Sequence, residues 1–314
     1  VVETGTNLGF AAACNRGAAD ASGELLCLLN PDAVPQAGWR EAIERPLTEA
    51  FGWAAWQGLV TADGGATVNS RGGVVHFTGI AWAGGAGERL APGRVEHGIG
   101  GESGPVVGAP RGFGARVASS GASPAEPGFV SGACLAIPRS AYLEAGGMPE
   151  GFFLYHEDVD LSLRLRLAGG RLGVECEARV DHDYQFVKGP AKWRLLERNR
   201  WATLVRTYPA ALLAVLAPAL VLTELALIPI ALAGGWLPQK LGAWADTLRS
   251  LPRLVGERRA IQAGRSVRAA EFAGPLTAEL DSAYLGAAGR SRLLRAGLRA
   301  YWALALALLG ARRR

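Results

Sequence analysis

The sequence is poor in the residues that build redox and metal-knuckle sites. It has four cysteines, and no two of them form a CxxC pair, which excludes the common zinc-knuckle and thiol-redox motifs. Their wide spacing favours reduced core thiols in a cytosolic compartment. These cysteines are Cys14, Cys27, Cys134 and Cys176.

Acidic residues are scarce in the second half of the chain. The formal net charge is +5 and the sequence pI is about 9.3. From Lys188 to Arg314 basic residues heavily outnumber acidic ones, whereas the first half is roughly balanced. This asymmetry suggests a basic tail that binds a surface. It fits an anionic partner such as a phosphate-bearing substrate or a membrane, and we expect no nucleic-acid partner.

The first fifty residues predict alternating helices and strands. Residues 7–21 are expected to form a helix with Asn7 as its N-cap. The apolar run at 24–29 predicts a strand buried on both faces of a parallel sheet, and residues 37–50 predict a second helix. The alternation indicates an α/β fold.

The middle of the chain is rich in glycine before regular patterns return. We expect a short strand at 73–77 and a mobile loop at 100–128. Further on, the patterns predict strands at 129–137 and 172–176, and helices at 138–145 and 159–168.

A long apolar stretch at 208–235 carries one charge, Glu224, and two interrupting prolines, Pro218 and Pro229. It is long enough to cross a bilayer. A single crossing would put the Arg-rich residues that follow on the outer side, against the positive-inside tendency. A proline-broken hairpin or an interfacial helix avoids this, and a helical subdomain packed on the globular part is the alternative. Residues 240–268 resemble a basic amphipathic helix that lies on an anionic membrane.

Asp32 directly follows the strand expected at 24–29. Ligands of open α/β sheets collect at the carboxyl ends of strands, and a carboxylate there can hold Mg²⁺ or Mn²⁺ together with substrate phosphates. The alternative is an ordinary turn residue after Pro31. His182, flanked by Asp181 and Asp183 beyond an apolar strand, is either a metal ligand or plain surface.

A second group of acids, Glu157, Asp158 and Asp160, lies at the start of a predicted helix. Carboxylates favour that position, so helix capping is one interpretation. The apolar run at 151–154 just before them favours a second interpretation, in which one of these acids is a general base. A carboxylate beside apolar side chains has a raised pKa and makes a better general base.

Several motifs together resemble the family 2 glycosyltransferases, especially their rhamnosyltransferase-like branch. The first are NLGFAAACNRG at 7–17 and LLNPDA at 28–33. They are followed, in the family's order, by VSGA at 130–133, GGMPEGFF at 146–153, EDVDL at 157–161, Arg164 and His182. The resemblance covers residues 1–205, and the order and spacing of these motifs make it specific.

The resemblance implies a GT-A fold for residues 1–205, and the apolar and basic stretches beyond it predict a helical, membrane-associated region at 206–314. It implies an inverting transferase that uses a nucleotide-diphosphate sugar as donor and Mg²⁺ or Mn²⁺ as cofactor. Asp158 matches the catalytic base, and Glu157 is expected to orient the acceptor. Asp32 and His182 match the metal site. The residues expected at the donor are Asn7, Gly9, Asn15 and Asp32.

The acceptor expected from the apolar, basic tail is a cell-envelope glycan or a lipid-linked glycan, with the catalytic domain on the cytoplasmic face of the membrane. The family's domain normally opens with a strand, a helix and a second strand, none of which is present in this sequence. We therefore expect a chain that begins inside the domain and lacks much of the donor pocket. A non-catalytic, membrane-bound module that binds glycan or a partner is the competing interpretation. A nucleotidyltransferase lacks support because no Gly-rich basic loop is present to grip a triphosphate.

Overall fold

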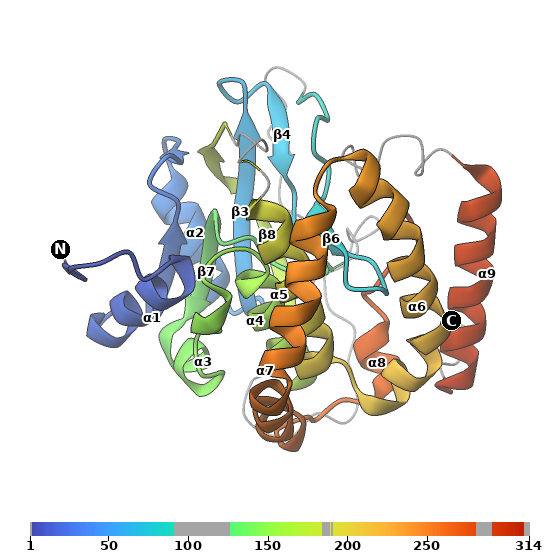
Figure 1. Cartoon of the computed structure of the whole chain (residues 1–314). Coiled ribbons are helices and arrows are strands. Elements are labelled where there is room, and N and C mark those ends of the chain that lie inside the picture. Colours follow the sequence, from blue (N-terminus) through green and yellow to red (C-terminus); the bar gives the residue numbers. More distant parts are fainter. Residues whose placement is uncertain (1, 91–125, 184–188, 190, 281–290, 311–314) are drawn as a thin grey trace.

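A mixed sheet organises the first part of the chain in the computed structural model, which describes residues 2–90, 126–183, 189, 191–280 and 291–310 (Figure 1). In spatial order its strands are β1 (Leu25–Leu29), β7 (Cys134–Pro138), β3 (Trp53–Ala62), β8 (Arg171–Asp181) and β2 (Val34–Pro35), and β4 (Thr67–Ser70) pairs with β3. Strands β3 and β8 run parallel, and the other pairs of this sheet are antiparallel. A separate ribbon joins β5 (Gly73–Val75) to β6 (Ala81–Ala83).

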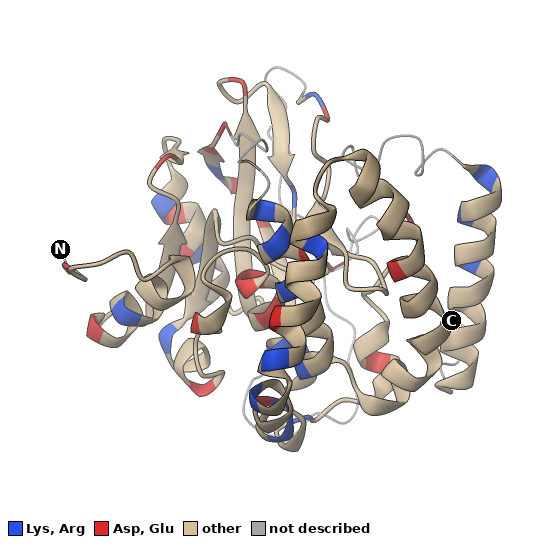
Figure 2. Cartoon of the chain, in the orientation of Figure 1, with Lys and Arg blue, Asp and Glu red and all other residues tan. Residues whose placement is uncertain are grey.

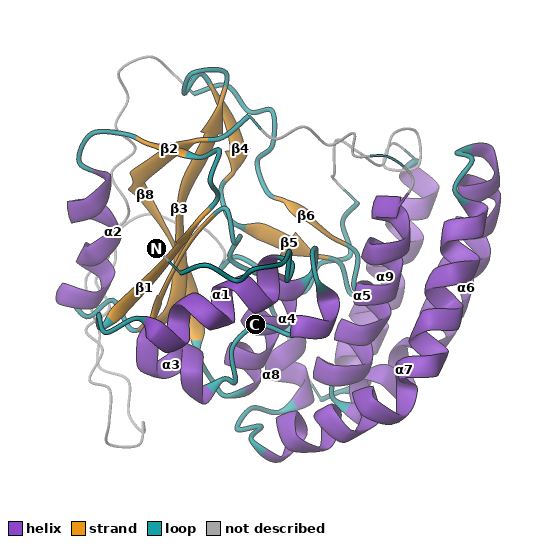
Figure 3. Cartoon of the chain, turned by 60° about the vertical axis from the view of Figure 1, so that its left-hand side comes forward, coloured by secondary structure: helices purple, strands orange, loops and turns teal. Residues whose placement is uncertain are grey.

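Helices cover both faces of the sheet, as the view in Figure 3 shows. Helices α1 (Phe10–Asp20), α3 (Arg139–Glu144) and α4 (Glu157–Leu167) pack on one face, and α2 (Trp39–Thr48) packs on the other. Strand β7 shows why both faces are apolar. Leu135 and Ile137 join the core under α1 and α3, whereas Cys134 and Ala136 join the core under α2. This alternation is the period of two that a strand imposes on its side chains. The expected α/β fold is confirmed.

Strand β1 forms where the apolar run predicts a strand, but its surroundings differ from the expectation. It pairs antiparallel with β7 and lies at one end of the row of strands in the described part of the chain. Leu26 is buried, while Cys27 is exposed. The prediction of a strand buried on both faces of a parallel sheet is therefore wrong, because an apolar run does not specify the direction of its partner strand.

Helix α1 begins at Phe10 and not at Asn7. Gly9 has φ 81° and ψ 167°, which breaks the helical backbone just before Phe10. The Oδ1 atom of Asn7 accepts a hydrogen bond from the Gly9 backbone N–H at 2.9 Å, so the predicted N-cap instead closes a short turn. A Cβ at Gly9 would lie 2.4 Å from the Phe153 ring, so this close approach requires glycine.

The C-terminal part is helical. Its elements are α5 (Ala191–Thr207), α6 (Ala210–Ala233), α7 (Leu237–Ala263), α8 (Ala269–Ala273) and α9 (Arg292–Leu308). The apolar stretch forms one continuous helix, α6, with Pro218 and Pro229 inside it, and the chain reverses between α6 and α7. The predicted break at the prolines is therefore wrong. Both prolines lie on the exposed side of α6.

One hydrophobic core joins the sheet domain to these helices. It brings Phe77, Phe129 and Leu163 together with Leu204, Leu216 and Trp302, and the Phe77 and Trp302 rings stack at 5.1 Å. The core therefore continues across position 205, and the division into two domains at that position stays a prediction. Of the loop predicted at 100–128, only 126–128 lie among the described residues.

Charge is unevenly distributed over the helical part (Figure 2). Charged residues gather on α5 and α7, whereas α6 is almost entirely uncharged. Within the described residues, α6 is the one helix whose length and composition would allow it to cross a membrane, and 22% of its most apolar window is buried.

Candidate active site

Two residues that are far apart in the sequence meet at one end of the sheet. Asp32 follows β1 and His182 follows β8, and the distance from His182 Nε2 to Asp32 Oδ1 is 3.1 Å. The His182 backbone N–H donates to the carbonyl oxygen of Thr61 at 2.8 Å, and the Asn69 side chain donates to the His182 carbonyl at 2.8 Å. These bonds fix the backbone of His182, whose side chain is 4% exposed, whereas the Asp32 side chain is 68% exposed. This pair can accept a cation from solvent.

The acid pair at the start of α4 lies next to this site. Asp158 Oδ2 accepts a hydrogen bond from the Gly132 backbone N–H at 3.1 Å, and Asp158 Oδ1 accepts one from the Val159 N–H at 2.8 Å. One residue further along, the Ala133 carbonyl accepts from the Asn30 N–H at 3.3 Å. The residues leading into β7 therefore contact Asp158 on one side and the segment carrying Asp32 on the other.

The capping interpretation of the acid pair stays open, because Asp158 accepts a hydrogen bond from the Val159 N–H in the first turn of α4. The N-cap residue itself, His156, has a left-handed conformation and makes no side-chain cap hydrogen bond. Asp160 is occupied elsewhere, because it pairs with Arg164 at 2.6 Å and with Arg206 at 2.8 Å. Among the three acids, this leaves Glu157 and Asp158 without a structural cation in the described part of the chain.

Burial controls the protonation of this pair. Glu157 is 5% exposed, its Oε2 atom has no hydrogen-bond partner among the described residues, and burial followed by the Asp158 charge raises its pKa to about 8. Burial also raises the pKa of Asp158 above its usual range. Burial lowers the pKa of His156 to about 4, so the neighbouring imidazole is neutral at pH 7. A carboxylate with a raised pKa is a more effective proton acceptor near neutral pH.

This burial predicts that Glu157→Gln stabilises the protein at alkaline pH. Between the ordinary glutamate pKa of 4.5 and the folded value of about 8, the folded protein keeps a proton that the unfolded chain has released. The free energy of unfolding therefore falls as pH rises through this window. At about pH 8.5 we expect the variant to exceed the wild type by about 2 kcal/mol or more, since each unit of pKa shift is worth about 1.4 kcal/mol.

Urea unfolding at about pH 5 and about pH 8.5 measures this effect. The two proteins should have similar stability at the lower pH, where Glu157 is protonated in the fold. If the free energy of unfolding depended on pH equally in both proteins, Glu157 would not titrate with a raised pKa.

The segment before the acid pair has an unusual backbone. Phe153, Tyr155 and His156 have φ values of 64°, 71° and 67°, in a region that favours glycine. Each such residue costs about 1–3 kcal/mol and persists only when its surroundings hold it. Here the segment is held by the side chain of Asn199, which lies on α5 and is fully buried. Its Nδ2 donates to the carbonyls of Phe152, Leu154 and Tyr155 at 3.1, 2.9 and 2.7 Å.

Sequence reasoning missed Asn199 as a functional residue. It stands between two arginines in the run ERNR, and no local pattern distinguishes it from a surface asparagine. Its role depends on α5 packing against residues 152–155, which only the tertiary structure specifies.

We expect Asn199→Ala to lower both stability and turnover. It removes the Asn199 donor from the Leu154 and Tyr155 carbonyls, whereas Phe152 keeps the Arg198 donor, and an unmet buried hydrogen bond costs about 1–3 kcal/mol. The released loop would also misplace Asp158, so kcat should fall while the KM for the donor stays near its original value. Thermal unfolding and initial rates, compared with the exposed Glu144→Gln of α3, measure both effects. An unchanged kcat at a temperature where the variant is folded would contradict the positioning role.

The other residues expected at the donor lie nearby, but their contacts differ. The Asn15 side chain donates to the Met148 carbonyl at 2.8 Å and to Glu150 Oε1 at 3.0 Å. Its Oδ1 accepts from Tyr142 Oη at 2.6 Å and from the Met148 N–H at 2.8 Å. Asn15 therefore supports the loop before η1 (Glu150–Phe152). Its place beside the donor, like that of the exposed Asn7, stays a prediction.

Comparison with known proteins gives a short but close match. No family model matches the sequence. Over 42 residues the chain is 52% identical to the N-acetylglucosaminyl-diphospho-decaprenol L-rhamnosyltransferase of Mycobacterium tuberculosis, in strains CDC 1551 / Oshkosh and H37Rv. The match covers 13% of this chain and 14% of the relative.

Two solved structures share low overall likeness with the chain. A crystal structure of GalNAc-T7 with UDP, GalNAc and Mn²⁺ has a TM-score of 0.43 and 16% identity, covering 66% of this chain and 37% of that one. The mannosyltransferase PcManGT of Pyrobaculum calidifontis, in complex with GDP-Man and Mn²⁺, has a TM-score of 0.33 and 17% identity. The match covers 96% of this chain and 66% of that one. The resemblance to the rhamnosyltransferase-like branch of the glycosyltransferases, expected from the motifs, is confirmed by the curated relative over the stretch that it matches.

Proposed function

We propose that the chain is a metal-assisted, inverting glycosyltransferase with the GT-A fold. It moves a sugar from a nucleotide-diphosphate donor to a hydroxyl of a cell-envelope glycan or a lipid-linked acceptor. The observation that carries this proposal is the meeting of Asp32 with His182, at 3.1 Å, beside the buried acid pair. The curated relative's name contains a lipid-linked diphospho-sugar, which is the acceptor class proposed for this chain.

The residues present fit a divalent cation shared with a diphosphate. Asp32 offers an exposed carboxylate oxygen and His182 an imidazole nitrogen, which are the ligands we propose for Mg²⁺ or Mn²⁺. Within the described residues no group of three or more His, Cys, Asp or Glu side chains could hold a metal alone. The donor phosphates and water would therefore complete the coordination. Such an ion neutralises the charge of a diphosphate leaving group.

Asp158 is the proposed general base. One of its oxygens takes the proton from the acceptor hydroxyl as that oxygen attacks the anomeric carbon from the face opposite the leaving diphosphate. This single displacement inverts the anomeric configuration. The hydrogen bonds from Gly132 and Val159 fix the carboxylate, and Glu157 orients the acceptor. On the donor side we propose Asn7, Gly9 and Asn15 together with Asp32.

The test is a transfer assay with the full-length protein. A panel of nucleotide sugars is incubated with Mn²⁺ and an acceptor glycan, and the released phosphate compound and the product anomer are identified. We expect release of a nucleoside diphosphate and a product of inverted configuration. Release of pyrophosphate would instead indicate a nucleotidyltransferase. Glycan binding with no release for any donor would favour a non-catalytic binding module.

A further inference from the structure

The outward side of α6 is apolar and unpaired with any other element in the described part of the chain. Its exposed residues recur every three or four positions and so share one face of the helix. They include Val221, Leu222, Leu225 and Leu232, which are 59%, 65%, 58% and 66% exposed. No charged residue lies on this face, because the single charge of α6 is Glu224 on the inward side. An exposed apolar face of this length marks a contact with another molecule or a membrane.

Helix α9 adds a second face of the same kind. Its exposed, uncharged positions again recur at helical spacing along the whole helix. On one face they are Leu293, Ala296, Gly297, Ala300, Ala303, Leu304, Ala307 and Leu308, and Leu294 is exposed beside it. The Tyr301 hydroxyl donates to the Val215 carbonyl at 2.6 Å and ties α9 to α6. The two helices lie side by side (Figures 1 and 3). We call their exposed faces together the α6–α9 surface.

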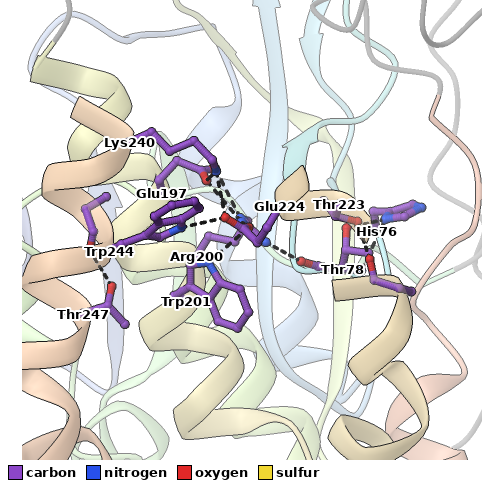
Figure 4. A network of polar contacts seen from close by, with 12 residues as sticks. His76, Thr78, Glu197, Arg200, Trp201, Thr223, Glu224, Lys240, Trp244 and Thr247 are labelled. Carbon is purple, nitrogen blue, oxygen red and sulfur yellow. Dashed lines mark hydrogen bonds and ion pairs between the residues drawn. The ribbon is translucent and has the colours of Figure 1, made fainter. Parts of the chain in front are cut away.

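Ion pairs and hydrogen bonds between side chains attach the inward side of α6 to the rest of the protein (Figure 4). Glu224 accepts from the Lys240 ammonium of α7 at 2.8 Å and pairs with the Arg200 guanidinium of α5. Two indole N–H groups also donate to it, Trp201 at 3.2 Å and Trp244 at 2.7 Å. The side chains of Arg200 and Lys240 are 2% and 0% exposed.

This arrangement opposes the insertion of α6 across a bilayer. If α6 moved away, the buried Arg200 and Lys240 side chains would lose Glu224. Among the described residues they would keep one carboxylate partner, Glu197. Leaving buried charges partly unpaired is strongly unfavourable. Glu224 itself would enter hydrocarbon with no cation beside it. The ion cluster therefore holds α6 on the protein with its apolar face outward.

The charge around the α6–α9 surface fits an anionic surface. Helix α9 itself carries three arginines and no acidic residue. Arg292 begins α9 and is exposed, and Arg295 lies one turn further along. Helices that combine an apolar face with flanking arginines bind the interface of membranes that contain anionic lipids.

We propose that the α6–α9 surface lies in the interfacial layer of a bilayer with anionic headgroups, with α6 parallel to the membrane and not across it. The sequence pattern assigns membrane contact to residues 240–268. One side of α7 packs against α5 and buries Lys240, Ala243 and Leu254. Leu241, Leu248 and Leu251 are 50%, 68% and 39% exposed, so membrane contact by this helix stays a prediction. This inference stands on its own, because membrane binding needs neither donor nor transfer.

Vesicle flotation tests it with the full-length protein. The vesicles are phosphatidylcholine alone, or phosphatidylcholine with phosphatidylglycerol. We expect the wild type to float with the anionic vesicles and less with the neutral ones. Leu222→Glu/Leu225→Glu and Leu304→Glu/Leu308→Glu should each lower the bound fraction at least about tenfold, since each change puts two carboxylates into the lipid contact. Leu143→Glu on α3, where Leu143 is 43% exposed, is the matched control and should bind as the wild type does.

Far-ultraviolet circular dichroism checks that every variant is folded. Equal flotation of the wild type and both double variants would overturn the inference, as would a wild type that binds neither kind of vesicle. A dimer of the wild type in light scattering, broken by the same double variants without any vesicle binding, would assign the surface to a second copy of the chain.

Extraction with alkaline carbonate separates lying on the membrane from crossing it. A protein held at the interface is released from the vesicles, whereas one with a spanning helix is retained. Release is the expected result. Retention of the wild type would show that α6 crosses the bilayer and would overturn the interfacial arrangement.

Discussion

Asp158→Asn is expected to lower kcat about 10²–10⁴-fold, the usual contribution of a general base. The variant keeps the shape of the side chain but cannot take a proton. Its amide retains one acceptor oxygen, so one of the two hydrogen bonds from Gly132 and Val159 is lost. We expect this to cost about 1 kcal/mol of stability, far too little to unfold the protein. Initial rates of nucleoside-diphosphate release measure the effect.

A matched control separates the chemistry from the general loss of a carboxylate. Asp20→Asn removes a half-exposed aspartate of α1 that pairs with Arg16 at 3.4 Å on the surface. We expect its kcat to equal that of the wild type, because exposed ion pairs contribute about 0–1 kcal/mol. Asp158→Asn with the same kcat as Asp20→Asn would remove Asp158 from the role of base.

Asp32→Ala should raise the Mn²⁺ concentration needed for half-maximal activity by at least about 100-fold, since losing even an outer-shell partner of a metal costs about 10–100-fold in affinity. The Asp32 side chain is 68% exposed, so its removal leaves no cavity and should not change the unfolding temperature. His182 is buried, and His182→Gln is the better variant there because it preserves most of the volume. We expect the same direction of change for both variants.

Metal titrations of the transfer rate measure this prediction, with Asp63→Ala as the control. Asp63 lies in a nearby turn, where its Oδ2 accepts a hydrogen bond from the Thr67 hydroxyl at 2.7 Å. A variant of Asp32 with the metal dependence of the wild type would contradict the proposed metal site.

Much of the sheet domain was predictable because its signals are local. The apolar run at 24–29 predicted β1, and the helical pattern at 159–168 predicted most of α4. The polar residues at strand ends also pointed to the correct place. Asp32 and His182 were each predicted from their own strand, and the structure brings them to 3.1 Å.

What the sequence did not show depends on contacts between distant elements. The run at 24–29 does not reveal that β1 pairs antiparallel with β7. Asn199 acquires its role from three carbonyls that α5 meets after folding. Pro218 and Pro229 suggested a break in the apolar stretch, yet both are accommodated in one continuous helix.

Glu224 is the clearest example of this limit. In the sequence it is a lone acid in an apolar stretch and says little about topology. In the structure it meets Arg200 and Lys240, which come from the helices before and after α6. The partners explain why α6 is fixed to the protein, and neither could be assigned to Glu224 from local spacing.

Calorimetric titration of a nucleoside diphosphate, with and without Mn²⁺, tests the central claim most directly. The full-length wild type and Asp32→Ala are compared under the same conditions, with UDP, GDP and dTDP as ligands. We expect the wild type to bind at least one of them in a Mn²⁺-dependent manner and Asp32→Ala to lose that dependence. Binding of equal strength without Mn²⁺, or in both proteins alike, would contradict a metal-assisted donor site at Asp32 and His182.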